Sequence, residues 1–88
     1  MRPRVEWITR ADDYILELLE STDMALTPRV LAFNLDYSRR YIGDRCRLLL
    51  EADLVEKVGD KQGFYRISDK GRAYLRGELS ADDLDSPS

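Results

Sequence analysis

Apolar residues near the N-terminus recur every three to four positions, the spacing of one face of a helix. Thr9 and Asp12 precede most of this repeat with the separation of a capping box, in which aspartate replaces the usual glutamate. The pattern therefore predicts a first helix from about residue 10 to residue 21. The repeat consists of Ala11, Ile15, Leu18 and Leu19.

Two further helix starts follow. Thr27 and Pro28 supply an N-cap and a proline at the first helical position, which predicts a short second helix ending around residues 34–37. Ser38 then opens a third helix, which reaches about residue 52 through a run of helix-forming residues. Residues 24–26 could add one short extended strand.

Beyond residue 52 the pattern changes to β-rich segments. Residues 54–58 and 64–67 flank a glycine-bounded turn, which predicts a β-hairpin. Ser68 caps a last helix that runs through Leu75. Gly71 within that helix counts against it, because glycine costs about 1 kcal/mol relative to alanine in a helix.

The third predicted helix has two distinct sides at about 100° per residue. Its apolar stripe consists of Ile42, Cys46 and Leu49. The opposite side carries Arg40, Asp44 and Arg47, and Arg39 and Arg45 flank the stripe. Gly43 leaves a bare patch that another backbone could approach closely. One side of this helix is therefore expected to pack, and the other to present arginines.

A short turn before such a helix is typical of a helix-turn-helix, whose second helix enters the major groove of DNA. An arginine can donate two hydrogen bonds to the O6 and N7 atoms of guanine, or it can hold a phosphate. Both uses stay open for Arg39, Arg40 and Arg47, and so does an ordinary solvated surface. Ser38 would offer a phosphate contact at the start of the helix.

Asp44 stands among these arginines and has two interpretations. It either accepts a hydrogen bond from a cytosine amino group or restrains Arg40 or Arg47 at helical spacing. We favour the restraint.

The hairpin contributes basic residues as well. A wing directly after the third helix can lie along the neighbouring DNA backbone, with Lys57, Lys61 and Arg66 available for phosphates. Basic residues also keep an exposed sheet edge soluble, which is the alternative explanation. Asp60 at the tip weakens the wing as a DNA contact.

Net charge argues against DNA binding at first sight. It is −3, with a pI near 4.9, whereas DNA-binding domains are usually basic. The three aspartates of the last nine residues account for the whole excess, so the remaining chain is neutral and its arginines cluster. The excess of arginine over lysine and of aspartate over glutamate is similar to proteins of salt-loving archaea, where carboxylates favour solubility.

Composition also excludes several classes of protein. The longest aliphatic run, residues 48–50, is far too short for a membrane span, and the N-terminus has no apolar stretch typical of a secretory signal. We therefore expect a cytoplasmic protein without membrane contact. One cysteine and no histidine leave no Cys/His metal site or histidine base, and no carboxylates have a pairing that suits catalysis. We expect no enzyme, no cofactor and no metal.

Two single residues have competing interpretations. Cys46 has arginine neighbours that would favour a reactive thiolate, but it shares the apolar stripe, so we interpret it as a buried, inert thiol. Trp7 either anchors a dimer or covers the core beneath the first helix, and the sequence favours neither.

Three stretches resemble a known family. Residues 38–49 with 52–57 resemble the recognition helix and first wing strand of winged helix-turn-helix regulators, and residues 65–75 resemble their second wing strand and closing helix. Trp7–Leu19 with this ending is similar to short haloarchaeal proteins related to the phage Phi-H repressor. Asp53 stands where the family commonly has glycine, and aspartate can adopt the left-handed conformation needed there at some cost.

The sequence thus predicts an α+β winged helix-turn-helix with a three-helix core, a hairpin wing and a C-terminal helix. We divide it into an N-terminal arm (1–8), a winged-helix DNA-binding domain (9–79) and an acidic tail (80–88). Leu84 is the tail's one large apolar residue, so we expect disorder there and an intact fold without it.

The resemblance implies sequence-specific binding of double-stranded DNA by a transcriptional regulator, namely a repressor. The recognition helix, about 38–52, would lie in the major groove, and the wing, about 54–67, on the backbone. We expect a homodimer, because one small module buries little DNA surface, with Trp7, the first helix and Tyr74 as contacts. The alternative is a winged-helix protein-interaction module that does not bind DNA. The sequence specifies no small-molecule effector.

Overall fold

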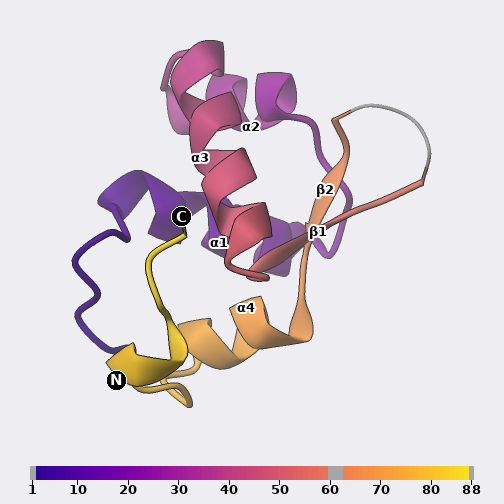
Figure 1. The fold of residues 1–88 in the computed structure, drawn as a ribbon. Helices are drawn as coiled ribbons and strands as arrows, with labels where there is room; N and C mark the ends of the chain where they lie inside the picture. Colours follow the sequence, from indigo (N-terminus) through magenta and orange to yellow (C-terminus); the bar gives the residue numbers. More distant parts are fainter. Residues whose placement is uncertain (1, 60–62, 88) are drawn as a thin grey trace.

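The computed structural model describes residues 2–59 and 63–87, and Lys61 of the predicted wing lies outside this part. Its elements confirm the predicted α+β winged helix-turn-helix and run in the predicted order (Figure 1). They are α1 (Arg10–Thr22), α2 (Pro28–Leu35), α3 (Arg39–Glu51), β1 (Val55–Lys57), β2 (Tyr65–Ile67), α4 (Asp69–Leu75) and the 3₁₀ helix η1 (Ala81–Asp83).

Side-chain caps begin the helices where the sequence predicted them. The Thr9 hydroxyl accepts from the Asp12 backbone N–H, and the Asp12 carboxylate accepts from the Thr9 N–H, which completes a capping box. Thr27 and Ser38 accept from the backbone N–H groups three residues on, at 3.2 and 3.1 Å. These bonds satisfy N–H groups that the first turn of a helix leaves without partners.

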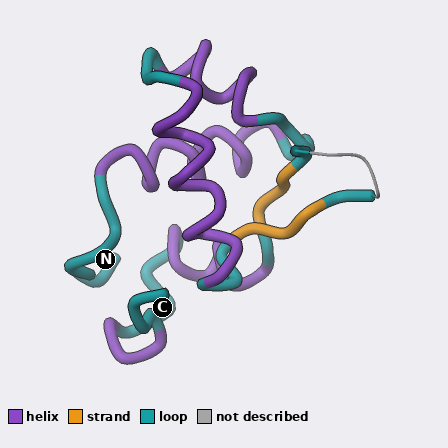
Figure 2. Tube along the Cα trace, turned by 45° about the horizontal axis from the view of Figure 1, so that its top comes forward, coloured by secondary structure: helices purple, strands orange, loops and turns teal. Residues whose placement is uncertain are grey.

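The wing is an antiparallel hairpin in which Val55 pairs with Ile67 and Lys57 with Tyr65. The loop that follows β1 extends away from the helices (Figure 2). The extended segment expected at residues 24–26 is reduced to a single bridge, in which Leu26 and Tyr65 exchange two backbone hydrogen bonds of 2.8 and 2.9 Å. This bridge ties the segment before α2 to the base of the wing.

The junction between α3 and the wing depends on two special residues. Asp53 ends α3 with a φ of 64°, the left-handed conformation expected of it. Gly71 lies in α4 directly against this corner, where a β-carbon would approach the Leu54 carbonyl oxygen to 2.2 Å. The glycine that weakens α4 as a helix is therefore required for α4 to pack against residues 53–54.

The core lies between the three first helices, the hairpin and α4. Each of α1 to α4 contributes side chains with almost no exposure, and α3 buries the predicted stripe. The cluster includes Ile15, Leu16, Leu19, Leu31, Ile42, Cys46, Leu49, Leu54, Val55, Ile67, Tyr74 and Leu84.

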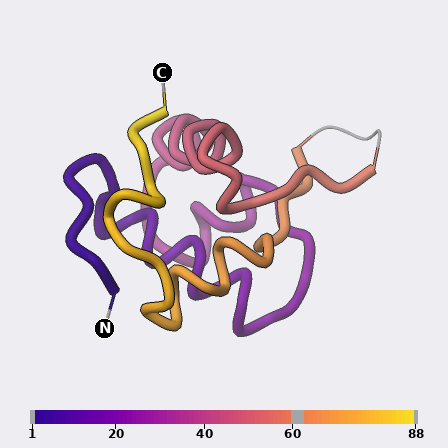
Figure 3. The backbone as a smooth tube through the Cα atoms, turned by 60° about the horizontal axis from the view of Figure 1, so that its bottom comes forward, coloured from indigo at the N-terminus to yellow at the C-terminus, as the bar shows by residue number. Residues whose placement is uncertain are grey.

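The C-terminal tail differs from the expected disorder. Ala81–Asp83 form η1, and Leu84 is only 2% exposed. The indole Nε1 of Trp7 donates to the Leu84 carbonyl oxygen at 2.9 Å, so the tail closes over the N-terminal arm (Figure 3). A single leucine has no periodicity, so no sequence pattern indicates that Leu84 is part of the core. Of the two interpretations of Trp7, the structure supports the one in which it covers the core.

No helix in the described ranges, 2–59 and 63–87, is both long and apolar enough to cross a membrane.

Candidate nucleic-acid interface

The exposed side of α3 is the centre of the candidate site. Arg39, Arg40, Asp44 and Arg47 are exposed, whereas the stripe on the other side is fully buried. Together with Gly43 and Pro28 they line an open groove of about 650 Å³. Pro28 belongs to this groove because α2 begins beside α3, a crossing of helices that spacing along the sequence does not reveal.

Two smaller hollows adjoin the groove, and both share Pro28 with it. One runs toward the wing and is lined by Pro28, Gly43, Arg47, Leu50, Glu51, Lys57 and Tyr65. The other is lined by Thr27, Pro28, Arg29, Arg39 and Gly63. The three hollows together form one surface, here called the α3 groove. It includes the start of α2, the exposed side of α3 and the base of the wing.

Strand alternation decides which wing residues face the α3 groove. Lys57 pairs with Tyr65 in the hairpin, and both line the hollow beside Arg47. Arg66 pairs with Glu56, and its Nε donates to a Glu56 carboxylate oxygen at 3.2 Å. These two side chains line a separate hollow with Asp23 and Arg72. The structure therefore brings Lys57 to the groove and places Arg66 away from it.

Asp44 forms an ion pair with Arg47 one turn along α3, the type of restraint we favoured. Both side chains are at least half exposed. A pair this open to solvent is weak, so it orients Arg47 without removing it from a competing partner.

Arg45 is the arginine of α3 that does not face the groove. Its guanidinium forms hydrogen bonds with both carboxylate oxygens of the fully buried Asp12, at 2.8 and 2.6 Å, and with the Trp7 carbonyl oxygen at 2.8 Å. The hydrogen bond to Asp12 is the main cause that raises the pKa of Arg45 above its usual value. The sequence places Arg45 beside the stripe but does not show that its partner is in α1.

Cys46 is buried, as we interpreted it. Desolvation raises the pKa of its thiol from 9.0 to about 12, so it is protonated at neutral pH. A protonated, buried thiol is a poor nucleophile and fits a role in packing.

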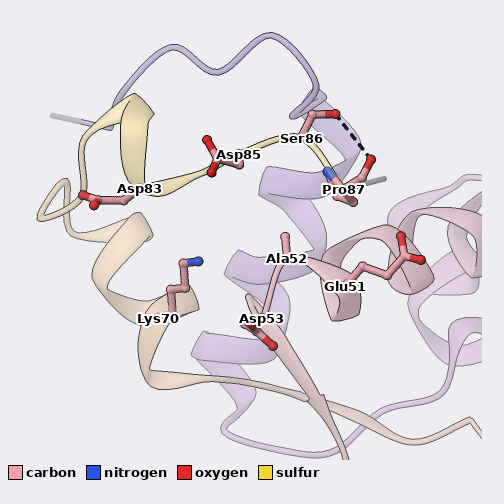
Figure 4. Close-up of a pocket in the computed structure, with 8 residues that line it drawn as sticks. All are labelled: Glu51, Ala52, Asp53, Lys70, Asp83, Asp85, Ser86 and Pro87. Atoms are coloured by element: carbon pink, nitrogen blue, oxygen red, sulfur yellow. Dashed lines mark hydrogen bonds between the residues drawn. The ribbon is translucent and has the colours of Figure 1, made fainter.

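A different kind of surface lies where the tail meets the end of α3 (Figure 4). Its carboxylates belong to Glu51, Asp53, Asp83 and Asp85, and Lys70 is the single basic residue that lines it. Such a surface repels phosphates. It is lined by none of the arginines of the α3 groove, so these arginines and the acidic residues of the tail occupy separate parts of the molecule.

Comparison with known proteins identifies the family. Residues 1–87 match the family described as winged helix-turn-helix phage repressor. The chain belongs to this family. It is 41% identical, over 97% of its length, to the repressor protein of Halobacterium phage phiH, and the match covers 98% of that protein.

A solved structure agrees with this assignment. The crystal structure of the PhiH1 repressor-like protein from Haloarcula marismortui superposes with a TM-score of 0.82 and 29% identity, over 99% of this chain and 96% of that one. Membership of a repressor family points to DNA-binding transcriptional regulation and to a regulator that is not an enzyme.

Proposed function

We propose that this protein is a repressor that binds a specific site in double-stranded DNA, with α3 in the major groove. Arg39, Arg40 and Arg47 reach base edges or phosphates from the exposed side of α3. Ser38 adds a phosphate contact, because its hydroxyl oxygen accepts from the Tyr41 N–H and its own proton stays available to donate. The protein would act in the cytoplasm, where its DNA is found.

The observation that carries this proposal is the charge of the α3 groove. In a chain of net charge −3, the three hollows of the groove contain five basic residues, Arg29, Arg39, Arg40, Arg47 and Lys57, against two acidic ones, Asp44 and Glu51. Such a concentration of arginine on the exposed side of a helix-turn-helix is the footprint that phosphate and base contacts require.

The wing supports α3 along the DNA backbone. Lys57 lies at the groove end of β1 and would hold a phosphate beside the site, and we expect the same of Lys61, four residues later in the sequence. Arg66 takes no part in this proposal, because it pairs with Glu56 on the other side of the hairpin.

Enrichment of duplexes from a random pool tests this function against its alternative. We expect the wild-type protein to enrich one sequence motif at moderate salt. Folded protein that retains no duplex would favour the protein-interaction module instead. Retention without any motif would show non-specific binding and contradict a repressor of a defined operator.

We further propose that two copies bind together, through α2 rather than through the expected contacts. Tyr74 is 2% exposed and its hydroxyl donates to Asp13 at 2.6 Å, so it offers no free surface. Phe33 on α2 is 87% exposed, and Val30 lies one turn away on the same side. Exposed apolar surface of this kind is typical of a contact with another protein.

Charge on α2 favours a second copy as that partner. Arg29 lies in the first turn and Asp36 caps the last, which opposes the dipole of α2 itself. When two α2 helices meet antiparallel across Phe33, Arg29 of each comes beside Asp36 of the other. The arrangement is self-complementary, as a two-fold interface must be.

Sedimentation without DNA tests this contact. We expect Phe33→Ser, Arg29→Glu and Asp36→Arg each to shift the protein toward a 10.2 kDa monomer. The double variant R29E/D36R restores the opposite charges and should recover association. The matched control is Met24→Ser, which removes an exposed apolar residue outside α2. A wild-type monomer at all concentrations would refute the interface.

A further inference from the structure

The two glycines inside helices have opposite explanations. Gly71 is required by packing, because a β-carbon there would collide with the Leu54 carbonyl oxygen. Gly43, in the middle of α3, has open space around the position of a β-carbon, with no atom within 4 Å apart from its chain neighbours and the adjacent backbone of α3. Alanine would stabilise the helix there, since glycine in a helix interior is unfavourable. Folding therefore gives no reason for Gly43, whereas an approaching ligand does.

The surface exposed by Gly43 is apolar and faces the start of α2. Pro28 lines each of the hollows that contain Gly43, and the hollow toward the wing adds Leu50 and Tyr65. Proline has no backbone N–H, and the N–H and carbonyl of Gly43 lie within the hydrogen-bonded interior of α3. The apolar surface between Pro28 and Gly43, here called the Pro28–Gly43 notch, can therefore contact a ligand but cannot form hydrogen bonds with it. The arginines on either side can donate hydrogen bonds.

The chemistry of the major groove restricts what such a notch can hold. Among the groups that base pairs present there, the 5-methyl group of thymine is the apolar one. We propose that the Pro28–Gly43 notch binds the 5-methyl group of one thymine in each copy's half of the operator. This inference rests on the proposed function, and it makes Gly43 and Pro28 residues that determine specificity.

The position of Gly43 along α3 places this thymine inside the site. Arg40 precedes Gly43 by about one turn and Arg47 follows by about one turn. At about 1.5 Å per residue the two arginines are about 10 Å apart along the helix, which corresponds to roughly three base-pair steps. The thymine should therefore lie between, or beside, the pairs that Arg40 and Arg47 contact.

The test uses duplexes enriched by the wild-type protein, with each thymine replaced in turn by deoxyuridine, which removes the methyl group alone. We expect one position per half-site to weaken binding about fourfold, the effect of exposing one buried methyl-sized group. The other thymines should change affinity by less than twofold. Gly43→Ala should raise the melting temperature, bind the thymine duplex less tightly, and no longer distinguish it from the deoxyuridine duplex.

Pro28→Ala removes the opposite wall and should also reduce the preference for thymine. The control is Ser21→Ala on α1, an exposed helix position outside the α3 groove, which should keep that preference. If the wild-type protein enriches no motif, the proposed function itself fails. If it enriches a motif but no deoxyuridine weakens binding, or Gly43→Ala keeps the preference, the notch proposal alone is wrong. A destabilised Gly43→Ala would also refute it, because Gly43 would then serve packing.

Discussion

Arg45 and Asp12 form a two-point ion pair that joins α3 to the first turn of α1. Asp12 is fully buried and also accepts from the Thr9 N–H, so one carboxylate completes the cap of α1 and fixes the position of α3. Charge-assisted, two-point hydrogen bonds of this kind set geometry as well as energy. The pair therefore determines how the exposed side of α3 is presented.

Breaking this pair should destabilise the protein strongly. Arg45→Ala leaves the Asp12 carboxylate buried without its counter-charge, a situation that costs about 3–5 kcal/mol. Arg47→Ala is the matched control, because it breaks an ion pair that is exposed and should cost less than about 1 kcal/mol. Urea unfolding of both variants measures the difference. Equal stabilities would show that the buried pair contributes no more than the exposed one.

The tail should prove structural. Deleting residues 80–88 removes Leu84 from the core and the acceptor of the Trp7 indole N–H, so we expect a loss of about 2–5 kcal/mol, as for truncating a buried leucine. Tryptophan fluorescence should shift to the red as Trp7 becomes more exposed. Deleting residues 86–88 is the control and should change little. A truncation after Leu79 with wild-type stability would contradict the structure and restore the expectation of a dispensable tail.

These two contacts show where sequence patterns fall short. Caps and periodicity predict the positions of the helices closely, because a helix cap is a local contact. The side chains that cap the helices accept hydrogen bonds from N–H groups only three residues away; they belong to Thr9, Thr27, Ser38 and Ser68. Partners far apart in sequence leave no such local trace. Arg45 binds Asp12, 33 positions earlier, and the Trp7 carbonyl oxygen, 38 positions earlier. The carbonyl of the buried Leu84 accepts from Trp7, 77 positions earlier.

The candidate site follows the same rule. The arginines of α3 were assigned to one side by helical spacing, and that side is exposed. For Pro28, by contrast, the sequence indicates only the start of a helix, because its place in the groove depends on how α2 crosses α3. The sequence places Arg66 in the wing but does not show the strand register that pairs it with Glu56.

Burial of Cys46 should make stability depend on alkaline pH. The pKa of the Cys46 thiol is 9.0 in the unfolded chain and about 12 in the folded one. The contribution of this difference to stability is complete below pH 9 and is lost as pH rises from 9 toward 12. The free energy of unfolding should fall by up to about 1.4 kcal/mol per pH unit in this range.

Cys46→Ala supplies the control for that slope. Between pH 9 and 10 the variant should show a flatter dependence than wild type. Above pH 10 both proteins should lose stability, because burial also raises the pKa of Tyr65 and Tyr74. Alkylation by iodoacetamide at pH 8.5 gives a second measurement, with slow labelling of the folded protein and fast labelling in urea. Equal labelling rates would mean that the thiol is accessible.

Replacing Arg40 and Arg47 together by alanine should abolish selective DNA binding and leave the fold unchanged. Both side chains lie on the exposed side of α3, opposite the buried stripe, so their loss removes no core contact. We expect a melting temperature within a few degrees of wild type, and an affinity for the enriched duplex at least about 30-fold lower, the effect of losing two base contacts of about 1–3 kcal/mol each. The matched control R10A/R76A removes the same charge from exposed positions outside the α3 groove and should retain selective binding.

The single variants then assign a role to each arginine. If Arg40 or Arg47 reads guanine, its alanine variant loses affinity for the enriched duplex alone. If it holds a phosphate, affinity for all duplexes falls and the slope of log affinity against log salt decreases by about one unit. Because the net charge of the chain is −3 and its tail is acidic, we expect few phosphate contacts and a shallower salt dependence than basic regulators show. The double variant R40A/R47A lacks both side chains on which the proposed contact surface is built. If it still binds the enriched duplex selectively, DNA contacts a different side of the molecule.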